Sequence, residues 1–402
     1  MPRPTAPSPQ PVASVSWPQV VAYRLHKHHV VERTTPDRLV DVVREMVGIH
    51  AQVASSAELQ LAARIDGLRP SDVRDALAGE RSLVKAWSMR GTLHLLTPED
   101  LARVVMASAT RERWREAPWQ KAFDITFEQV EAIIAAAGET LSAEPMLRAD
   151  LADAIAAHVS DPVVGAKLRS GWGTFLGPVA QRGLLVFGPP AGRNVTFVRP
   201  SAWLGRPISP PELAAAAPSE RGDIPLEPLT ALAGLIHSFL TAFPGSGRDA
   251  TARWWGSVRA GLVNEARALL GDRVVDIDVA GTRQWILPEN VEALKATEPF
   301  EGVRLLPGFD PWINELPRRT DAVMTTAHHD RIYRMAGWVT PVVVVDGRVE
   351  GTWELVAGKR GGIAVQPLER WRAGVKTELK AEVDRLAAFL DRPLPIEVAA
   401  ST

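Results

Sequence analysis

Two hydrogen-bonding side chains, His50 and Gln52, lie on a short connector, residues 48–53 (GIHAQV), that follows a strongly apolar stretch. A neutral imidazole can accept a proton near neutral pH, and a carboxamide can both donate and accept hydrogen bonds. If the connector is extended, the two side chains project to the same side and form a compact polar pair. The plainer alternative is a histidine that caps a helix beside a solvent-exposed glutamine, and spacing alone favours this alternative.

The other candidate residues have simpler explanations. The adjacent histidines at 28–29 and at 328–329 point in different directions within any regular element, so we interpret them as surface or capping residues. Trp254-Trp255 and the FDPW segment at 309–312 are interpreted as core and turn residues, and a functional role stays open only for Asp310. The sequence has no cysteine, phosphate-binding loop, HExxH or GxSxG, so we expect no metal and no cofactor.

Charge is balanced over the whole chain but not along it. The net charge is −1, from 46 basic and 47 acidic residues, whereas dedicated DNA-binding domains are usually basic. Between Asp161 and Glu212 there is no acidic residue, although six basic residues occur there: Lys167, Arg169, Arg182, Arg193, Arg199 and Arg206. This gap predicts a local electropositive surface, with a chance fluctuation in a solvated segment as the alternative.

Three stretches repeat one pattern, in which helices precede a short β-hairpin whose last strand runs into a proline-marked turn. The hairpins end at Leu96, Val198 and Leu287, a spacing of about 90 to 100 residues that fits tandem domains and is too long for a solenoid. In the first hairpin the turn falls at Arg90-Gly91. Helices followed by a two-stranded wing predict a winged helix in each stretch.

The domain boundaries follow from this pattern and from composition. A length of 402 residues, 46% of them hydrophobic, indicates a multi-domain globular protein without a membrane span. We expect a disordered proline-rich tail over 1–14, winged helices over 15–100, 101–206 and 228–298, and a linker over 207–227. Residues 299–402 have the alternation of a small C-terminal β domain and a closing helix, with Asp346-Gly347 as a hairpin turn.

Several segments taken together resemble the AlkZ-like winged-helix DNA glycosylase superfamily over nearly the whole chain. They are GIHAQVASSAELQLAAR, RGTLHLLTPEDL, LLVFGPPAGRNVTFVRP, LLPGFDPWI and GWVTPVVVVDGRVEGTW, in that order. The resemblance implies a mainly α fold with β, in which three tandem winged helix-turn-helix domains form a C-shaped arrangement around duplex DNA, plus the C-terminal β domain. The family motif is Gln–apolar–Gln, with a His-first variant in a subgroup and a Gln–apolar–Asp relative. Here it is His50-Ala51-Gln52.

The resemblance implies that His50 and Gln52 are catalytic. Guanine alkylated at N7 is cationic, so it can leave without a strong general acid, while a glutamine orients a water and an imidazole of ordinary pKa accepts its proton. The expected function is therefore a cytoplasmic, monomeric and monofunctional glycosylase that removes bulky N7-alkylguanine adducts, or crosslinks, made by a genotoxic natural product. The rival hypothesis is a non-catalytic winged-helix transcriptional regulator.

The partner expected in either case is duplex DNA. We predict phosphate contacts at the following residues: Arg90, Lys167, Arg169, Arg182, Arg193, Lys359 and Arg360.

Overall fold

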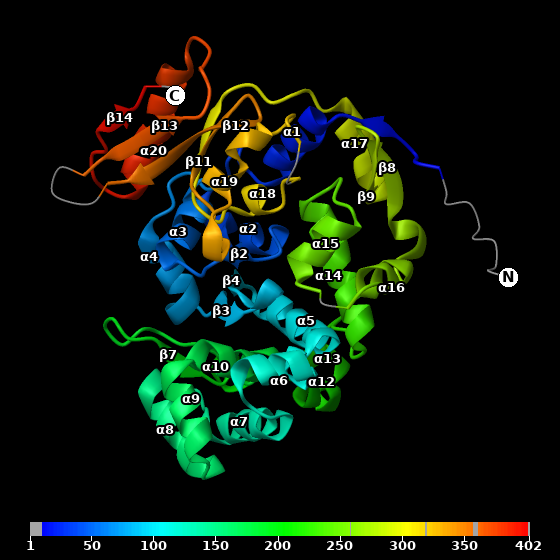
Figure 1. Cartoon of the computed structure of the whole chain (residues 1–402), viewed down its shortest axis with the longest axis vertical. Coiled ribbons are helices and arrows are strands. Elements are labelled where there is room, and N and C mark those ends of the chain that lie inside the picture. Colours follow the sequence, from blue (N-terminus) through cyan, green and yellow to red (C-terminus); the bar gives the residue numbers. More distant parts are fainter. Residues whose placement is uncertain (1–9, 258, 318–319, 357–360, 401–402) are drawn as a thin grey trace.

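The computed structural model describes residues 10–257, 259–317, 320–356 and 361–400, and this part of the chain is mainly helical with several small sheets (Figure 1). The described strands form sheets of three, five and six strands. Within these ranges, no helix combines the length and the apolar character needed to cross a membrane.

The first repeated unit positions the motif. Its elements are, in order, α2 (Leu39–Glu45), β2 (Ile49–His50), α3 (Ala54–Ala62), α4 (Pro70–Arg74), β3 (Val84–Trp87) and β4 (Leu93–Leu96). After α2 the chain turns sharply, because Val47 and Gly48 have φ values of 54° and 94°, and a side chain at Gly48 would collide with Leu96. The chain then enters β2, which pairs with β4, and β4 pairs with β3.

The second unit repeats this strand order. Its elements are α7 (Phe127–Thr140), β5 (Met146–Leu147), α8 (Arg148–Val159), α9 (Pro162–Ser170), α10 (Trp172–Gln181), β6 (Val186–Phe187) and β7 (Thr196–Val198). Again the first strand, β5, lies beside the last, β7, and β7 pairs with β6. Helix α9, which is capped by Asp161, lies between α8 and α10. Lys85 of β3 pairs with Phe187 of β6, so the two units share one six-stranded sheet.

The third unit contains α14 (Pro228–Ala242), α15 (Arg248–Trp255), α16 (Leu262–Ala268), β8 (Val275–Val279) and β9 (Thr282–Ile286). Ser246 bridges Trp285 of β9 and so occupies the place of a first strand. α14 packs against α5 (Pro98–Ser108), and residues of the first and third units form one apolar cluster, which also takes in Val186 and Val198 of the second unit. Most apolar residues of the second unit form another cluster, together with Trp87 and Leu93 of the first. Residues 207–227, expected as a linker, contain α12 (Pro210–Ala215) and α13 (Pro218–Arg221).

The C-terminal region has a five-stranded sheet with the order β10-β11-β12-β13-β14. The strands are β10 (Val303–Leu306), β11 (Val342–Val345), β12 (Arg348–Leu355), β13 (Ile363–Pro367) and β14 (Ile396–Val398), and the helices are α18 (Pro311–Asn314), α19 (His329–Ile332) and α20 (Val375–Phe389). Asp346 and Gly347 have φ values of 50° and 78°, as the predicted hairpin turn requires.

The N-terminal segment differs from the expectation. Strand β1 (Ser14–Val15) pairs in parallel with β8 of the third unit, and the Val12 N–H donates to the Asp276 carbonyl at 2.9 Å. Part of the segment expected to be disordered is therefore ordered. Helix α1 (Trp17–Lys27) packs against the C-terminal region and the third unit, because Val21, Ala22 and Leu25 share a cluster with the former and Val20 shares one with the latter.

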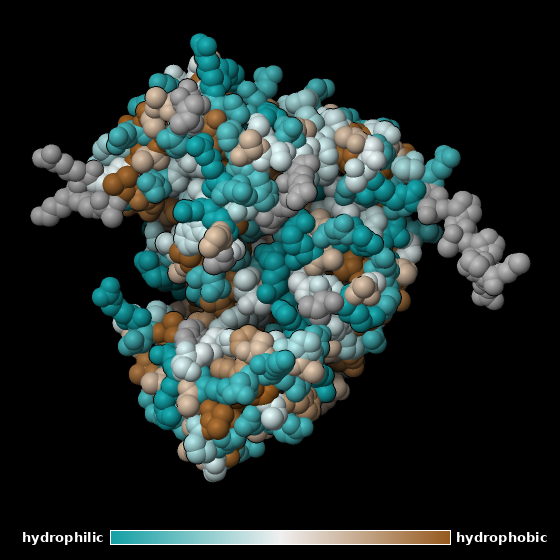
Figure 2. All heavy atoms as spheres, viewed as in Figure 1, coloured by the Kyte–Doolittle hydropathy of each residue, from teal (hydrophilic) through white to brown (hydrophobic). Residues whose placement is uncertain are grey.

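The outline of the molecule is notched on one side. The notch lies between the second unit and the rest of the chain, and α3, α4 and the β6–β7 hairpin lie on that side (Figures 1 and 2). The connector that carries His50 and Gln52 leads directly into α3.

Candidate active site

His50 lies on a strand and is buried, so the interpretation as a helix-capping histidine is wrong. β2 sets its register opposite His94 of β4. The His50 ring stacks on Phe309, with 4.7 Å between ring centroids and 12° between planes, and meets the His94 ring edge-on at 5.3 Å. His50 is 5% exposed. Its buried Nδ1 has no hydrogen-bond partner among the described residues.

Gln52 lies two residues further on and is exposed. Its Oε1 accepts a hydrogen bond from the backbone N–H of Leu93 at 3.3 Å, and the N–H of Ala51 donates to the Leu93 carbonyl at 2.7 Å. Since a backbone N–H can only donate, this contact fixes the orientation of the carboxamide. The Nε2 donor of Gln52 is left without a partner in the described part of the chain.

The surroundings keep the imidazole neutral. Burial, followed by the charge of nearby Arg90, lowers the pKa of His50 to about 4. The pKa of His94 is also lowered, by burial and by His50 and Arg90. Desolvation disfavours the charged form of any histidine. At neutral pH His50 is therefore an unprotonated base, although a weaker one than the ordinary pKa used in the sequence analysis implies.

A small cavity of about 20 Å³ adjoins His50, which is room for about one water molecule. Its lining combines the first unit with two other parts of the chain: Met46, Gly48, His50, Met89, Arg90, His94, Phe243, Trp254, Pro311, Asn314 and Glu315. The Glu315 carboxylate is buried and pairs with Arg90 at 2.9 Å, and its Oε2 has no hydrogen-bond partner among the described residues. The motif thus lies where three parts of the chain meet.

Asp310 has a structural role, as the turn interpretation required. It is fully buried, pairs with Arg64 at 2.7 Å and accepts the backbone N–H of Trp312 at the start of α18. Phe309, its neighbour, has a φ of 62°, in the left-handed region that bulky residues avoid. The ion pair and the helix cap hold this strained residue against His50. Sequence reasoning missed Phe309, and its only signal was the FDPW segment.

Most basic residues of the acid-free stretch form ion pairs, among them three of the candidate phosphate contacts, Lys167, Arg169 and Arg182. Acidic partners come from other elements: Lys167 pairs with Asp124 at 3.3 Å, Arg169 with Asp153 at 2.6 Å, Arg182 with Glu112 at 2.8 Å, Arg199 with Glu212 at 2.9 Å, and Arg206 with Glu99. Arg193 differs, because it is exposed on the β6–β7 turn and its side chain has no partner in the described ranges. Arg90 is held by Glu315. Lys359 and Arg360 lie outside the described residues.

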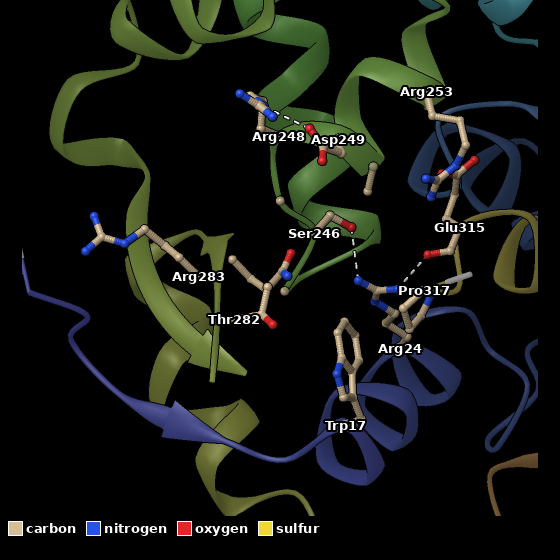
Figure 3. A pocket seen from close by; sticks show the side chains of 14 residues that line it. Trp17, Arg24, Ser246, Arg248, Asp249, Arg253, Thr282, Arg283, Glu315 and Pro317 are labelled. Carbon is tan, nitrogen blue, oxygen red and sulfur yellow. Dashed lines mark hydrogen bonds and ion pairs between the residues drawn. The ribbon is translucent and has the colours of Figure 1, made fainter. Parts of the chain in front are cut away.

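A second, larger cavity of about 350 Å³ lies beside α15. Figure 3 shows four arginines around it, Arg24, Arg248, Arg253 and Arg283. Their charges are largely compensated: Arg248 pairs with Asp249, Arg253 with Glu315 and Arg283 with Asp276, while Arg24 donates to backbone carbonyls and to Ser246. Among the described residues, no group of three or more histidine, aspartate or glutamate side chains could hold a metal ion.

Comparison with known proteins identifies the family. Residues 43–389 match the family described as DNA glycosylase AlkZ-like. A curated relative from Streptomyces sahachiroi, an interstrand DNA cross-link repair glycosylase, is 34% identical over 343 residues, which is 85% of this chain and 88% of the relative. The solved structure of the Streptomyces sahachiroi DNA glycosylase AlkZ superposes with a TM-score of 0.85 at 31% identity, over 96% of this chain and all of that one. The chain is therefore a member of the AlkZ-like DNA glycosylase family.

Proposed function

We propose that the protein is a monofunctional glycosylase that hydrolyses the N-glycosidic bond of bulky N7-alkylguanine adducts in duplex DNA. One observation carries the proposal: a buried, neutral imidazole and a carboxamide with an unpartnered donor occupy a single connector, in a DNA glycosylase family. A neutral base and an amide donor are the two groups needed to hold and deprotonate a water.

In the proposed reaction, the bond between the sugar C1′ and the guanine N9 breaks, and its electron pair neutralises the cationic purine. The water oxygen bonds to C1′, while His50 accepts the proton and Gln52 orients the water. Because the leaving group is a cation, oxocarbenium character develops before the water must lose its proton. A base as weak as His50, with a pKa of about 4, is sufficient for such a late proton transfer. The motif holds no lysine, which agrees with hydrolysis rather than Schiff-base chemistry.

The repeated units support binding to duplex DNA. In each, the first strand or bridge lies beside the last strand of a hairpin, and we interpret the three units as winged helices. The notch beside α3, α4 and the β6–β7 hairpin (Figures 1 and 2) is the concave face on which we place the duplex. An open face of this kind can receive a bulky adduct that a closed base-flipping pocket would exclude.

We further propose that the substrate is the DNA damage of a genotoxic natural product, and that excision protects the producing cell. The name of the Streptomyces sahachiroi relative refers to interstrand crosslinks, so crosslinked guanines are included in the proposed substrate class. The test is incubation with a duplex that carries one N7-alkylguanine, followed by heat or alkali to cleave the abasic site. Strand cleavage at the lesion supports the proposal. Intact strands, together with sharp footprints on undamaged DNA, would support the regulator instead.

A further inference from the structure

A groove of about 950 Å³ begins where the motif ends. One wall is the start of α3, with Val53 and Ser55, and the opposite wall is formed by β12 and β13 of the C-terminal sheet. The segment from Arg331 to Trp338, which follows α19, lines the same space. The groove is therefore continuous with the connector that carries Gln52, and it is far larger than the one-water cavity that adjoins His50.

Three aromatic rings lead from the buried motif into this groove. His50 stacks on Phe309 at 4.7 Å, and Phe309 meets Trp338 edge-on at 5.1 Å and 75°. Exposure rises along the series, from 5% at His50 through 8% at Phe309 to 44% at Trp338. The Trp338 ring thus packs on Phe309, which in turn stacks on His50. Much of the surface of Trp338 is exposed and can contact a ligand.

The turn that carries Trp338 is unusually apolar for an exposed position. Met335, three residues before it, is 92% exposed. Single exposed apolar residues need no explanation, but here two large ones share one turn beside an active site. The turn is fixed, since the Arg334 N–H donates to the Trp338 carbonyl at 2.8 Å and Tyr333 bridges Val339.

The same segment carries two arginines that form no ion pair. Arg331 and Arg334 are exposed and line the groove, and their side chains have no acidic partner among the described residues. The lining also contains the carboxylates of Asp330, Glu354 and Glu397, so the positive charge is local to these two guanidinium groups. This contrasts with the paired arginines of the second unit. A free guanidinium beside an exposed indole suits a ligand that is both aromatic and attached to a polyanion.

We propose that this groove, defined by Val53, Ser55, Arg331, Arg334 and Trp338, binds the bulky part of the adduct. The occupant is a planar aromatic ring system attached to guanine N7, which stacks on the Trp338 indole while the two arginines face the flanking phosphates. The inference rests on the proposed function. It assigns substrate size selectivity to Trp338, a specificity residue, and leaves the hydrolysis itself to His50 and Gln52.

The experiment compares two substrates that share a cationic leaving group. Duplexes carry either N7-methylguanine or the N7-guanine adduct of an aflatoxin epoxide, and single-turnover excision is measured for the full-length wild type, Trp338→Ala and Trp338→Phe. Loss of one aromatic stacking contact costs on the order of 10- to 100-fold. We expect Trp338→Ala to lower the ratio of aflatoxin-adduct to methylguanine rates by this factor, and Trp338→Phe to recover most of it. Phe123→Ala, which removes an exposed ring of the second unit (38% exposed), should leave the ratio unchanged.

Two results would overturn the inference. One is an unchanged ratio in Trp338→Ala. The other is an equal fall on both substrates, because the substitution would then act through Phe309 on His50 rather than on the adduct. Failure of the proposed function has a different signature: the wild-type protein would excise neither lesion.

Discussion

Arg64 and Asp310, which are 246 residues apart, form a fully buried bidentate ion pair with N–O distances of 2.7 and 2.9 Å. Arg64 lies just after α3, the helix that follows the motif, and Asp310 follows Phe309, the residue stacked on His50. The pair therefore ties the first unit to the C-terminal region at the point where the imidazole is held. The site is therefore built from this long-range contact as well as from the motif.

Loss of this ion pair should lower the free energy of unfolding. Removal of one partner from a buried ion pair costs about 3 to 5 kcal/mol, because the other charge stays buried without compensation. We expect Asp310→Ala to lower the free energy of unfolding by this amount in urea titrations. The matched control is Asp384→Ala, which removes an exposed partner of Lys380 on α20 and should change stability by less than about 0.5 kcal/mol.

The double variant Arg64→Met/Asp310→Leu sharpens this test. It removes both charges, and replacement of a buried ion pair by apolar residues is often neutral. We expect it to recover much of the stability that Asp310→Ala loses. If Asp310→Ala unfolds within about 0.5 kcal/mol of the wild type, the pair is not what secures the two regions.

The low pKa of His50 makes stability depend on pH in a defined window. Folding lowers this pKa from 6.5 to about 4. Between these pH values His50 is therefore protonated in the unfolded chain and neutral in the folded chain. Stability is thus fully present above pH 6.5 and is lost progressively as the pH falls toward 4. The contribution is roughly 3 kcal/mol between pH 7 and pH 4. Urea titrations across this range should show a shallower pH dependence for His50→Gln than for the wild type, and identical slopes would contradict the assignment.

The hairpins and their turns were predictable from sequence, whereas the pairing of strands between units and the charge distribution in space were not. Alternation and turn residues at Arg90-Gly91 and Asp346-Gly347 are local signals, and both hairpins form as expected. The stretch without acidic residues is a feature of the sequence, but it does not show which acidic residues from other segments pair with its lysine and arginines. Asp124 and Glu112 lie outside the gap and neutralise Lys167 and Arg182.

The environment of the motif is likewise a tertiary property. No pattern around residue 50 indicates that Phe309, from a distant turn, covers the imidazole, or that burial lowers its pKa. The placement of α1 follows the same logic, because an amphipathic helix reveals that it has a buried face but not which core receives it. Length, periodicity and turn chemistry thus predict elements, while partners that are far apart in sequence decide the electrostatics of the site.

Salt dependence of DNA binding should separate Arg193 from its paired neighbours. Each phosphate contact contributes about 0.9 to the slope of log affinity against log salt concentration. Since the Arg193 side chain has no partner in the described ranges, we expect Arg193→Ala to flatten the slope by about 0.9. Arg169→Ala, which removes a partner of Asp153, serves as the matched control and should change the slope less. Equal slopes for wild type and Arg193→Ala would place the β6–β7 turn away from the duplex.

Substitution of the motif tests the catalytic assignment directly. If His50 accepts the proton of the water that Gln52 orients, either change to alanine should slow single-turnover excision by about 10² to 10⁴ with nearly unchanged DNA affinity, because these contacts form mainly in the transition state. His50→Gln retains a hydrogen-bonding side chain in the buried site and should keep more activity than His50→Ala. His158→Ala, which removes an exposed histidine beside Glu139 on the second unit, controls for unrelated effects.

The pH dependence of the excision rate then shows whether His50 accepts a proton or only fills space. A histidine base acts in its neutral form, so the wild-type rate should fall only as the pH drops toward about 4, the pKa that burial and Arg90 impose on His50, and not near 6.5. His50→Gln should lack this fall within the range in which it stays folded, as monitored by circular dichroism. A wild-type rate in His50→Ala would mean that the imidazole only fills space between Phe309 and His94. In that case Gln52 alone would have to position the water.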